Sequence, residues 1–394
     1  MFTFKLIGCV LLIISCMVGA GILALPLMAY QLGVFLTSVI IIIFYILMCI
    51  SGLLTLEVSS QLPLHKNHFS SIGQFAFGQY GKYITAGAFV IAIYGAMIAY
   101  IAASEDLLSS ILSYFSLSMQ KNYLGLLFVL IIGGIVIISM ACAEKLNRLM
   151  MLLKLSTLLL SIFILSHYAF SGKSMEISLH FNLLSEATLV IALAFCYQLL
   201  IPSLVNYLGK EHLIELKYVI ICSTTITCFI YLLWSVIIVG YMDSLQANHS
   251  GINSFSQLMI FLNQNGQLKL VANLIHGFLE ITVFASFIAV SIAFIDFWID
   301  VLNLTTKFTG RLVAGILVYL PAYLAVTFYE NIFIGALSIS GYFGLVYALL
   351  IPSLAAMNTY DKANYQYIFG GKTLRLILVI ISIIIMLFTL LSSL

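Results

Sequence analysis

Long apolar segments, separated by short polar connections, follow one another along the whole chain of 394 residues. A helix needs about 20 apolar residues to cross the hydrocarbon layer of a membrane, and eleven segments of the sequence satisfy this length. The predicted spans are 5–31, 34–56, 83–113, 123–142, 148–170, 186–208, 214–241, 270–301, 311–328, 332–354 and 373–393. No connection between them has room for a soluble domain. We therefore predict an all-α integral membrane protein, with residues 1–394 forming a single transmembrane domain.

The composition agrees with this prediction. Hydrophobic residues make up 63% of the chain and charged residues 8%, whereas soluble domains average about 25% charged residues. The net charge is only +2, and no basic cluster favours a nucleic-acid partner. All seven cysteines lie in or beside apolar segments, so we expect buried free thiols and no disulfide framework.

Basic residues divide unequally between the two sides of the predicted membrane. If the N-terminus lies inside, every lysine and arginine except Lys121, Lys173 and Lys269 falls at an inner connection or at the inner end of a span. Inner connections of membrane proteins are enriched in these residues. The count therefore predicts a cytoplasmic N-terminus and, after eleven spans, a C-terminus on the outer side.

Helix-breaking residues interrupt two of the spans. The run GAGILALP at 19–26 places two glycines and Pro26 in the first span, and Pro202 follows CYQLLI in the sixth. Spans 1 and 6 begin two five-span halves, about 5–170 and 186–354, which enter the membrane from opposite sides, and 373–393 is an extra helix. Interrupted helices at matching positions of inverted repeats are typical of transporter binding sites.

The interruption in span 1 predicts a site for a zwitterion. Non-helical backbone at membrane depth is tolerated where it lines a cavity, and free N–H groups at the start of a half-helix favour a carboxylate. Freed carbonyl groups can bind a cation or an ammonium group. In the alternative reading, Pro26 only kinks a packed helix and the glycines let a neighbouring helix approach. The predicted backbone donors are Gly19, Ala20, Gly21, Ile22 and Leu23.

Two ionisable residues lie deep in the predicted spans, where charges are functional candidates. Lys154, in span 5, either snorkels to the inner interface or places its ammonium group where a related protein would hold a metal cation. In the second case it would exchange a proton during transport. Glu280, in span 8, is a second candidate for proton coupling. His276 lies one turn before it and is typical of a hydrogen-bonded structural residue.

Aromatic residues near the two interruptions are candidates for contacting a substrate side chain. Tyr94 lies near the middle of span 3, so its hydroxyl group needs a partner, either another helix or a ligand. Phe195 and Tyr197 lie in the interruption of span 6, beside Gln198. These four residues complete the predicted substrate site.

Several runs of the sequence resemble the hydroxy/aromatic amino acid permease family, especially its tyrosine-specific branch. The matching runs are GAGILALPLMAY (19–30), LEVSSQLP (56–63), GQYGKYITAG (78–87), AYIAASEDLLSS (99–110), NRLMMLLK (147–154), IPSLVNYLG (201–209), FIDFWIDVLN (294–303), IPSLAAM (351–357) and GGKTLR (370–375). The resemblance implies a LeuT-like fold of five-plus-five inverted repeats, with spans 1, 3, 6 and 8 around the site. It also implies proton-driven uptake of aromatic amino acids across a bacterial inner membrane, which would make the outer compartment the periplasm.

One run departs from the family pattern. The interruption of span 6 in this family is usually rich in glycine and carries a histidine, where this chain has Gln198. Glutamine does not titrate, and the adjacent Leu199 and Leu200 would narrow the site. The sequence therefore leaves open whether tyrosine, tryptophan, phenylalanine or a small hydroxy amino acid such as serine is carried.

We predict a secondary transporter, a proton symporter that imports an aromatic amino acid, most readily tyrosine, by alternating access. Its partners are the amino acid, protons and the lipid bilayer, and we expect no cofactor, metal site, enzymatic activity or obligate protein partner. A passive channel or facilitator is the first alternative, although no filter sequence or ring of charges is visible. A membrane-embedded enzyme lacks a recognisable catalytic motif, and a sensor lacks an output domain.

Overall fold

The computed structural model describes residues 2–63, 69–114, 116–117, 119–166, 181–244, 269–302, 304–305, 307–329, 331–362 and 371–392. Throughout these ranges the regular structure is helical, and no strand occurs. Within the described residues, ten helices are long and apolar enough to cross a membrane, and the bent pair α1 and α2, counted as one span, gives an eleventh. The prediction of an all-α membrane protein is therefore confirmed.

The helices follow the predicted spans closely. The first half contains α1 (Phe2–Met17), α2 (Ala20–Leu32), α3 (Val34–Gln61), α4 (Phe69–Tyr114), α5 (Lys121–Phe128), α6 (Gly134–Ile138) and α7 (Met140–Leu165). The second half contains α8 (Phe181–Ala194), α9 (Ile201–Leu208), α10 (Leu213–Ser244), α12 (Lys269–Val301), α13 (Phe308–Phe328), α14 (Ile332–Leu345) and α15 (Ile351–Asn358), and α16 (Gly371–Leu391) follows. Lys66 and Lys173, which entered the charge count, lie outside the described residues.

Helix α4 begins earlier than the sequence predicts. Residues 69–82, expected as part of a connection, are helical, and the chain bends at Gly78, whose φ is 69° and ψ −154°. The segment buries Ile72 and Ala76, and the Asn358 side-chain amide donates a hydrogen bond to the Ala76 carbonyl group. Contacts distant in sequence therefore stabilise a stretch that is too polar to be recognised as a span.

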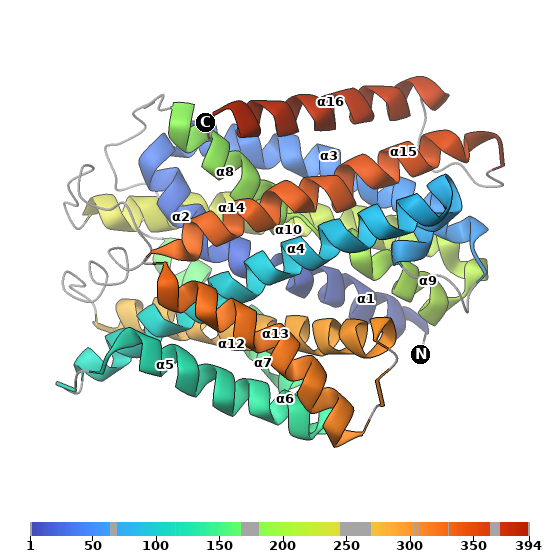
Figure 1. The fold of residues 1–394 in the computed structure, drawn as a ribbon. Helices are drawn as coiled ribbons and strands as arrows, with labels where there is room; N and C mark the ends of the chain where they lie inside the picture. The colour runs from blue at the N-terminus through green and yellow to red at the C-terminus, as the bar shows by residue number, and fades with distance from the viewer. Residues whose placement is uncertain are drawn as a thin grey trace.

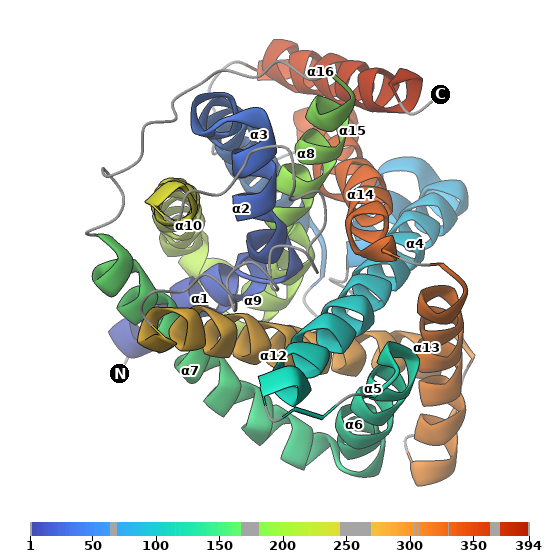
Figure 2. The ribbon, with the colours of Figure 1, turned by 90° about the vertical axis from the view of Figure 1, so that its left-hand side faces the viewer.

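The two interrupted spans lie at the centre of the bundle (Figures 1 and 2). In Figure 2, α2 and α8 run side by side, with α3, α10 and α14 around them. Helices α4, α5, α6 and α13 gather on one side, and α16 lies on the periphery next to α15. The buried apolar side chains form one continuous core, so the interruptions face protein rather than lipid.

A buried ion pair attaches α16 to the rest of the bundle. The guanidinium group of Arg375 lies 2.5 Å from the Glu57 carboxylate of α3, and the two side chains are 0% and 2% exposed. Arg375 also lies over the ring of Tyr360. A buried charge that loses its partner typically costs about 3–5 kcal/mol, so the peripheral helix is held by more than apolar contact.

Three prolines lie within long helical segments, where each removes a backbone donor. Proline has no N–H group, so the carbonyl group four residues earlier loses its hydrogen bond. In all three cases a side chain from another helix donates to that carbonyl group, as required where no water is present. The pairs are Trp234 to Ile22 for Pro26 (3.3 Å), Tyr94 to Leu317 for Pro321 (2.8 Å) and Ser51 to Ala348 for Pro352.

Candidate functional site

The first span is interrupted between α1 and α2, which meet at an angle of 52°. Only Val18 and Gly19 separate the two helices, and Gly19 has the non-helical dihedral angles φ −124° and ψ −134°. The predicted break is confirmed, but Pro26 does not cause it, because Pro26 lies inside α2 and Trp234 supplies the donor that it removes. Residues Ala20–Ile22 begin α2, so their N–H groups have no acceptor within the helix, whereas the N–H of Leu23 is the first to bond within it, to the carbonyl group of the capping residue Gly19. The Gly19 N–H donates to the Met17 carbonyl oxygen at 2.7 Å.

The sixth span is interrupted between α8 and α9. After Ala194 the residues Phe195–Tyr197 are not helical, and a 3₁₀ turn over Gln198–Leu200 leads into α9. Pro202 is the second residue of α9, a position in the first helical turn that tolerates the missing N–H group. Here the proline does mark the break, as predicted.

The two breaks are in direct contact at Gly21. A Cβ atom added at Gly21 would lie 2.8 Å from the Cα atom of Ala194 and would also collide with its Cβ atom. Glycine is therefore required at this position for the first turn of α2 to lie against the last residue of α8. The alternative reading, that the glycines admit a close neighbour, is correct in this respect, and the neighbour is the other broken helix.

Tyr231 of α10 joins the two breaks through hydrogen bonds. Its hydroxyl oxygen lies 2.6 Å from the carbonyl oxygen of Met17 and 2.9 Å from that of Ala194, the last residues of α1 and α8. The side chain is fully buried and its ring packs against Phe195 at 5.1 Å. The sequence does not single out Tyr231, because it is one of 22 tyrosines and only the packing of α10 brings it here.

Lys154 of α7 occupies the C-terminal end of α1. Its ammonium group donates to the carbonyl oxygens of Ser15 at 2.9 Å and Val18 at 2.7 Å, and the residue is 1% exposed. The C-terminus of a helix carries a partial negative charge, which a cation stabilises. Lys154 therefore does not snorkel to the interface. Its ammonium group binds carbonyl groups at the break, while its exchange of a proton stays a prediction.

Helices α4 and α12 flank the break in the first span. A Cβ atom added at Gly19 would lie 3.0 Å from the Tyr100 hydroxyl oxygen and 3.6 Å from the Ser286 hydroxyl oxygen. Spans 1, 3 and 8 thus meet at Gly19, as the family resemblance implied. The tyrosine of span 3 that reaches this point is Tyr100.

Tyr94 lies on the same helix, but its hydroxyl group points elsewhere. It donates to the Leu317 carbonyl oxygen of α13, and its ring contacts Phe294 of α12 at 4.8 Å. Another helix therefore satisfies the hydroxyl group, which is one of the two partners that the sequence left open. The predicted contact between Tyr94 and a substrate stays a prediction.

The polar groups of the second break are directed toward α3. The Tyr197 hydroxyl group donates to the Met48 carbonyl oxygen at 3.2 Å, and the Gln198 side-chain amide donates to the same oxygen at 3.3 Å. The side-chain amide oxygen Oε1 of Gln198 accepts from the backbone N–H of Tyr197. Phe195, Tyr197 and Gln198 are all fully buried, so they pack inside the second break. Their contact with a substrate stays a prediction.

The remaining candidates lie on α12 and among the cysteines. Glu280 is half-buried and His276 is 8% exposed. Among the described residues, no group of three or more histidine, cysteine or acidic side chains is placed to hold a metal ion. The cysteines are free, but the expectation that all are buried is wrong, because Cys16, Cys142 and Cys222 are exposed.

Known proteins have sequences related to this chain over nearly its whole length. The sequence profile of the tryptophan/tyrosine permease family matches residues 3–389. The tyrosine-specific transport system 1 of Haemophilus influenzae is 26% identical over 389 residues, covering 96% of this chain and 94% of that protein. The glutamine transporter 2 of Aliivibrio fischeri is 23% identical over 364 residues, covering 92% of this chain and 91% of that protein.

Solved structures give the fold independently. The crystal structure of MhsT in complex with L-phenylalanine matches with a TM-score of 0.66 and covers 98% of both chains, at 15% sequence identity. At this identity the likeness establishes the fold alone. The predicted LeuT-like fold, with its first and sixth spans interrupted, is confirmed.

Proposed function

We propose that this chain, which belongs to the tryptophan/tyrosine permease family, imports an aromatic amino acid together with protons. Tyrosine is its first candidate substrate. The family and the similar proteins are membrane transporters, so the function class is transport and not catalysis. The proposed location is a bacterial inner membrane, with the N-terminus in the cytoplasm and the C-terminus in the periplasm. The amino acid and protons would be its only obligatory partners.

The observation that carries the proposal is the pair of hydrogen bonds from Lys154 to Ser15 and Val18. They place a titratable cation on the carbonyl groups at the end of α1, next to the proposed substrate site. A protonated Lys154 compensates the negative end of the α1 dipole, and a neutral amine does so less. Loss of the proton would therefore weaken the attachment of α1 to α7, and this would link protonation to movement of the broken helix. Glu280 is the second proposed proton-coupling residue.

The proposed substrate lies between the two breaks near the middle of the membrane. Its carboxylate would accept hydrogen bonds from the N–H groups of Ala20–Ile22, since the start of α2 combines unpaired donors with a positive dipole. Lys154 already binds the Ser15 and Val18 carbonyl groups, and Tyr231 binds those of Met17 and Ala194. The substrate ammonium group would therefore bind carbonyl groups of the second break at Phe195–Cys196, where the partner among the described residues is the weak thiol donor of Cys16, 3.8 Å from the Cys196 carbonyl oxygen.

The aromatic side chain of the substrate would lie toward Tyr94, Phe195 and Tyr197. Phe195 and Tyr197 are fully buried in this structure, so this contact would require the second break to open, and aromatic pairs would then prefer edge-to-face or offset contact. The bulky Leu199 and Leu200 limit the volume at the second break. Tyrosine is the first candidate because the tyrosine-specific transport system of H. influenzae is a relative over nearly the whole chain. Tryptophan, phenylalanine and serine are the alternatives to test against it.

Uptake by the purified full chain in proteoliposomes tests the proposal. Labelled L-tyrosine should accumulate above its external concentration when the outside is acidic, in sodium-free buffer, and a protonophore should abolish the accumulation. Liposomes without protein give the background. Equal uptake with and without the pH gradient would instead indicate a passive facilitator.

Competition identifies the substrate in the same assay. Unlabelled tryptophan, phenylalanine, serine and glutamine are added in excess, the last because one relative is a glutamine transporter. Tyrosine should compete most strongly, followed by the other aromatic amino acids. Stronger competition by serine or glutamine would reject the aromatic assignment while leaving the transport mechanism in place.

A further inference from the structure

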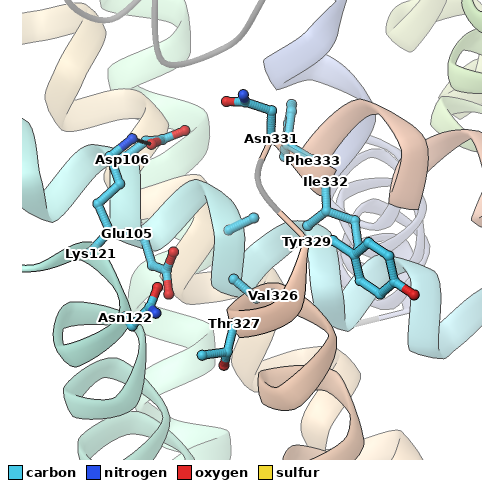
Figure 3. Close-up of a pocket in the computed structure, with 11 residues that line it drawn as sticks. Glu105, Asp106, Lys121, Asn122, Val326, Thr327, Tyr329, Asn331, Ile332 and Phe333 are labelled. Carbon is cyan, nitrogen blue, oxygen red and sulfur yellow. Dashed lines mark hydrogen bonds and ion pairs between the residues drawn. The ribbon is translucent and has the colours of Figure 1, made fainter.

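A cavity lies away from the two breaks, where α4 ends, α5 begins and α13 turns into α14 (Figure 3). Its volume is about 370 Å³. Glu105 and Asn122 line one wall, and Val326, Thr327 and Ile332 line the opposite wall. Glu105 is five residues beyond Tyr100, about 140° further around α4, so it lies on a different face of the helix from the residue that reaches Gly19.

The Glu105 carboxyl group is the unusual feature of this cavity. The residue is 6% exposed, and its buried Oε1 atom has no hydrogen-bond partner among the described residues. In Figure 3 the carboxyl group points from α4 toward Asn122 and Val326. A buried carboxylate without a donor is unfavourable, and such groups in proteins normally have partners. The Oε1 atom itself is packed against Gly125 of α5, but the carboxyl group lines the cavity, so a cation bound there would neutralise the charge of the whole group.

The surrounding helices leave room for this carboxyl group. A Cβ atom added at Gly125 of α5 would lie 2.9 Å from the Cγ atom of Glu105 and would collide with its Oε1 atom. Gly125 therefore allows α5 to pack against the carboxyl group. The nearby Asp106 is different, because its carboxylate is paired with the ammonium group of Lys121 at 2.6 Å.

The lining of the cavity suits an ammonium group better than a metal ion. An ammonium group has three donors and no acceptor, and the cavity offers oxygen acceptors on Glu105, Asn122 and Thr327. The Thr327 hydroxyl proton goes to the Tyr323 carbonyl oxygen at 2.7 Å, so the lone pairs of its oxygen remain available. Divalent cations prefer several carboxylate ligands, whereas the second carboxylate here, that of Asp106, is already paired with Lys121. Val326 and Ile332 would cover the apolar body of an organic ligand.

We propose that this cavity binds the primary ammonium group of a small organic molecule, a free amine or an amino acid, with Glu105 as its counter-ion. The site is separate from the proposed transport site and does not depend on it. In the proposed orientation this end of α4 faces the outside, so the ligand would bind from the periplasm.

Equilibrium dialysis of labelled tyramine against the purified full chain in detergent, at low salt, tests the proposal. Tyramine carries an ammonium group but lacks the carboxylate that the transport site is proposed to need. Wild-type protein should bind one tyramine per chain in a saturable manner. Glu105→Gln, which keeps the shape of the side chain, should weaken binding at least tenfold. Asp361→Asn, in an exposed ion pair with Lys372, should leave it unchanged.

A variant on the opposite wall of the cavity shows whether a loss of binding in Glu105→Gln comes from a folding defect. Ile332→Trp fills the cavity while Glu105 stays intact, and it should also abolish tyramine binding, with both variants retaining cooperative thermal unfolding. Wild-type affinity in either variant, or no saturable binding by the wild type, would overturn the proposal. Each remaining feature of the ligand is then tested by competition.

Two competitors define the chemistry of the ligand. Displacement of tyramine by L-tyrosine identifies amino acids as ligands, and its absence identifies free amines; both outcomes support an ammonium site. The acid 3-(4-hydroxyphenyl)propionate, which has no amine, should not displace tyramine. Displacement by this acid, or by millimolar sodium or potassium chloride, would overturn the assignment to an ammonium group.

Discussion

Gly21 and Ala194 lie so close together that the first turn of α2 rests directly on the last residue of α8, with no space for a side chain at Gly21. Gly21→Ala should therefore force the two breaks apart. Overpacking of this kind costs about 1–3 kcal/mol, and we expect a lower thermal unfolding temperature together with loss of L-tyrosine uptake. Gly8→Ala is the matched control, because a Cβ atom at Gly8 meets nothing within 4 Å.

A second variant makes this prediction specific. Ala194→Gly removes the methyl group that collides with the new one, so the double variant Gly21→Ala/Ala194→Gly should recover part of the uptake and of the unfolding temperature. Recovery is expected to be partial, because the Ala194 Cα atom remains 2.8 Å from the added Cβ atom. Normal uptake by Gly21→Ala alone would show that the contact is not needed for transport.

Lys154 is expected to control energy coupling rather than substrate entry. Lys154→Ala removes the donor to Ser15 and Val18, and it should abolish accumulation of L-tyrosine against a gradient while sparing exchange of internal for external tyrosine. Lys154→Arg keeps the charge but does not release a proton, so it should fail in the same way. Lys145→Ala, at an exposed position on the same helix, should accumulate tyrosine normally. Unchanged proton-driven uptake in Lys154→Ala would remove this lysine from the mechanism.

Tyr231 is expected to hold the two broken helices together. Tyr231→Phe removes only the hydroxyl group and leaves the buried Met17 and Ala194 carbonyl groups without this donor, at a cost of about 1–3 kcal/mol for an unsatisfied group. Thermal unfolding should occur at a lower temperature and the maximal rate of uptake should fall. Tyr218→Phe, 65% exposed on the same helix, should change neither quantity. An unaltered Tyr231→Phe protein would show that the two hydrogen bonds contribute nothing measurable.

Tyr94 has two possible roles, and a proline distinguishes them. Tyr94→Phe leaves the Leu317 carbonyl group without a donor, whereas Pro321→Ala restores the missing backbone N–H at the correct position. If the hydroxyl group serves only the helix, the double variant Tyr94→Phe/Pro321→Ala should regain the unfolding temperature and the uptake of the wild type. If Tyr94 also contacts the substrate, stability should return but the KM for tyrosine should stay raised. Thermal unfolding and concentration-dependent uptake measure the two effects separately.

The spans themselves could be predicted from the sequence because a membrane helix needs only length and apolar composition. The locations of the two breaks were also predictable in outline from glycine and proline. The exact break in the first span was not, because the effect of Pro26 depends on Trp234, more than 200 residues later. A proline disrupts a helix less when another side chain supplies the lost hydrogen bond, and only the tertiary structure reveals such a side chain.

The candidate site was predictable to a similar extent. Lys154 stood out because a charge deep in an apolar span needs a reason, and the structure supplies its carbonyl partners. Tyr231 and Tyr100 did not stand out, because the sequence of a membrane helix does not show which groups of other helices its hydroxyl groups contact. The start of α4 was missed for a related reason: residues 69–82 are held by contacts with distant segments such as Asn358, which hydropathy does not record.

The proline-associated hydrogen bonds also limit which helices can slide past each other. If α2 slid along α10, the Ile22 carbonyl group would lose the donor from Trp234, and if α13 slid along α4, the Leu317 carbonyl group would lose the donor from Tyr94. Each shift would leave a carbonyl oxygen inside the bundle without its donor. The two pairs are therefore suited to travel as rigid units during a transport cycle. Gly19, which directly precedes α2, lies against Tyr100 of α4, so a movement of the two units relative to each other would separate them at the break between α1 and α2.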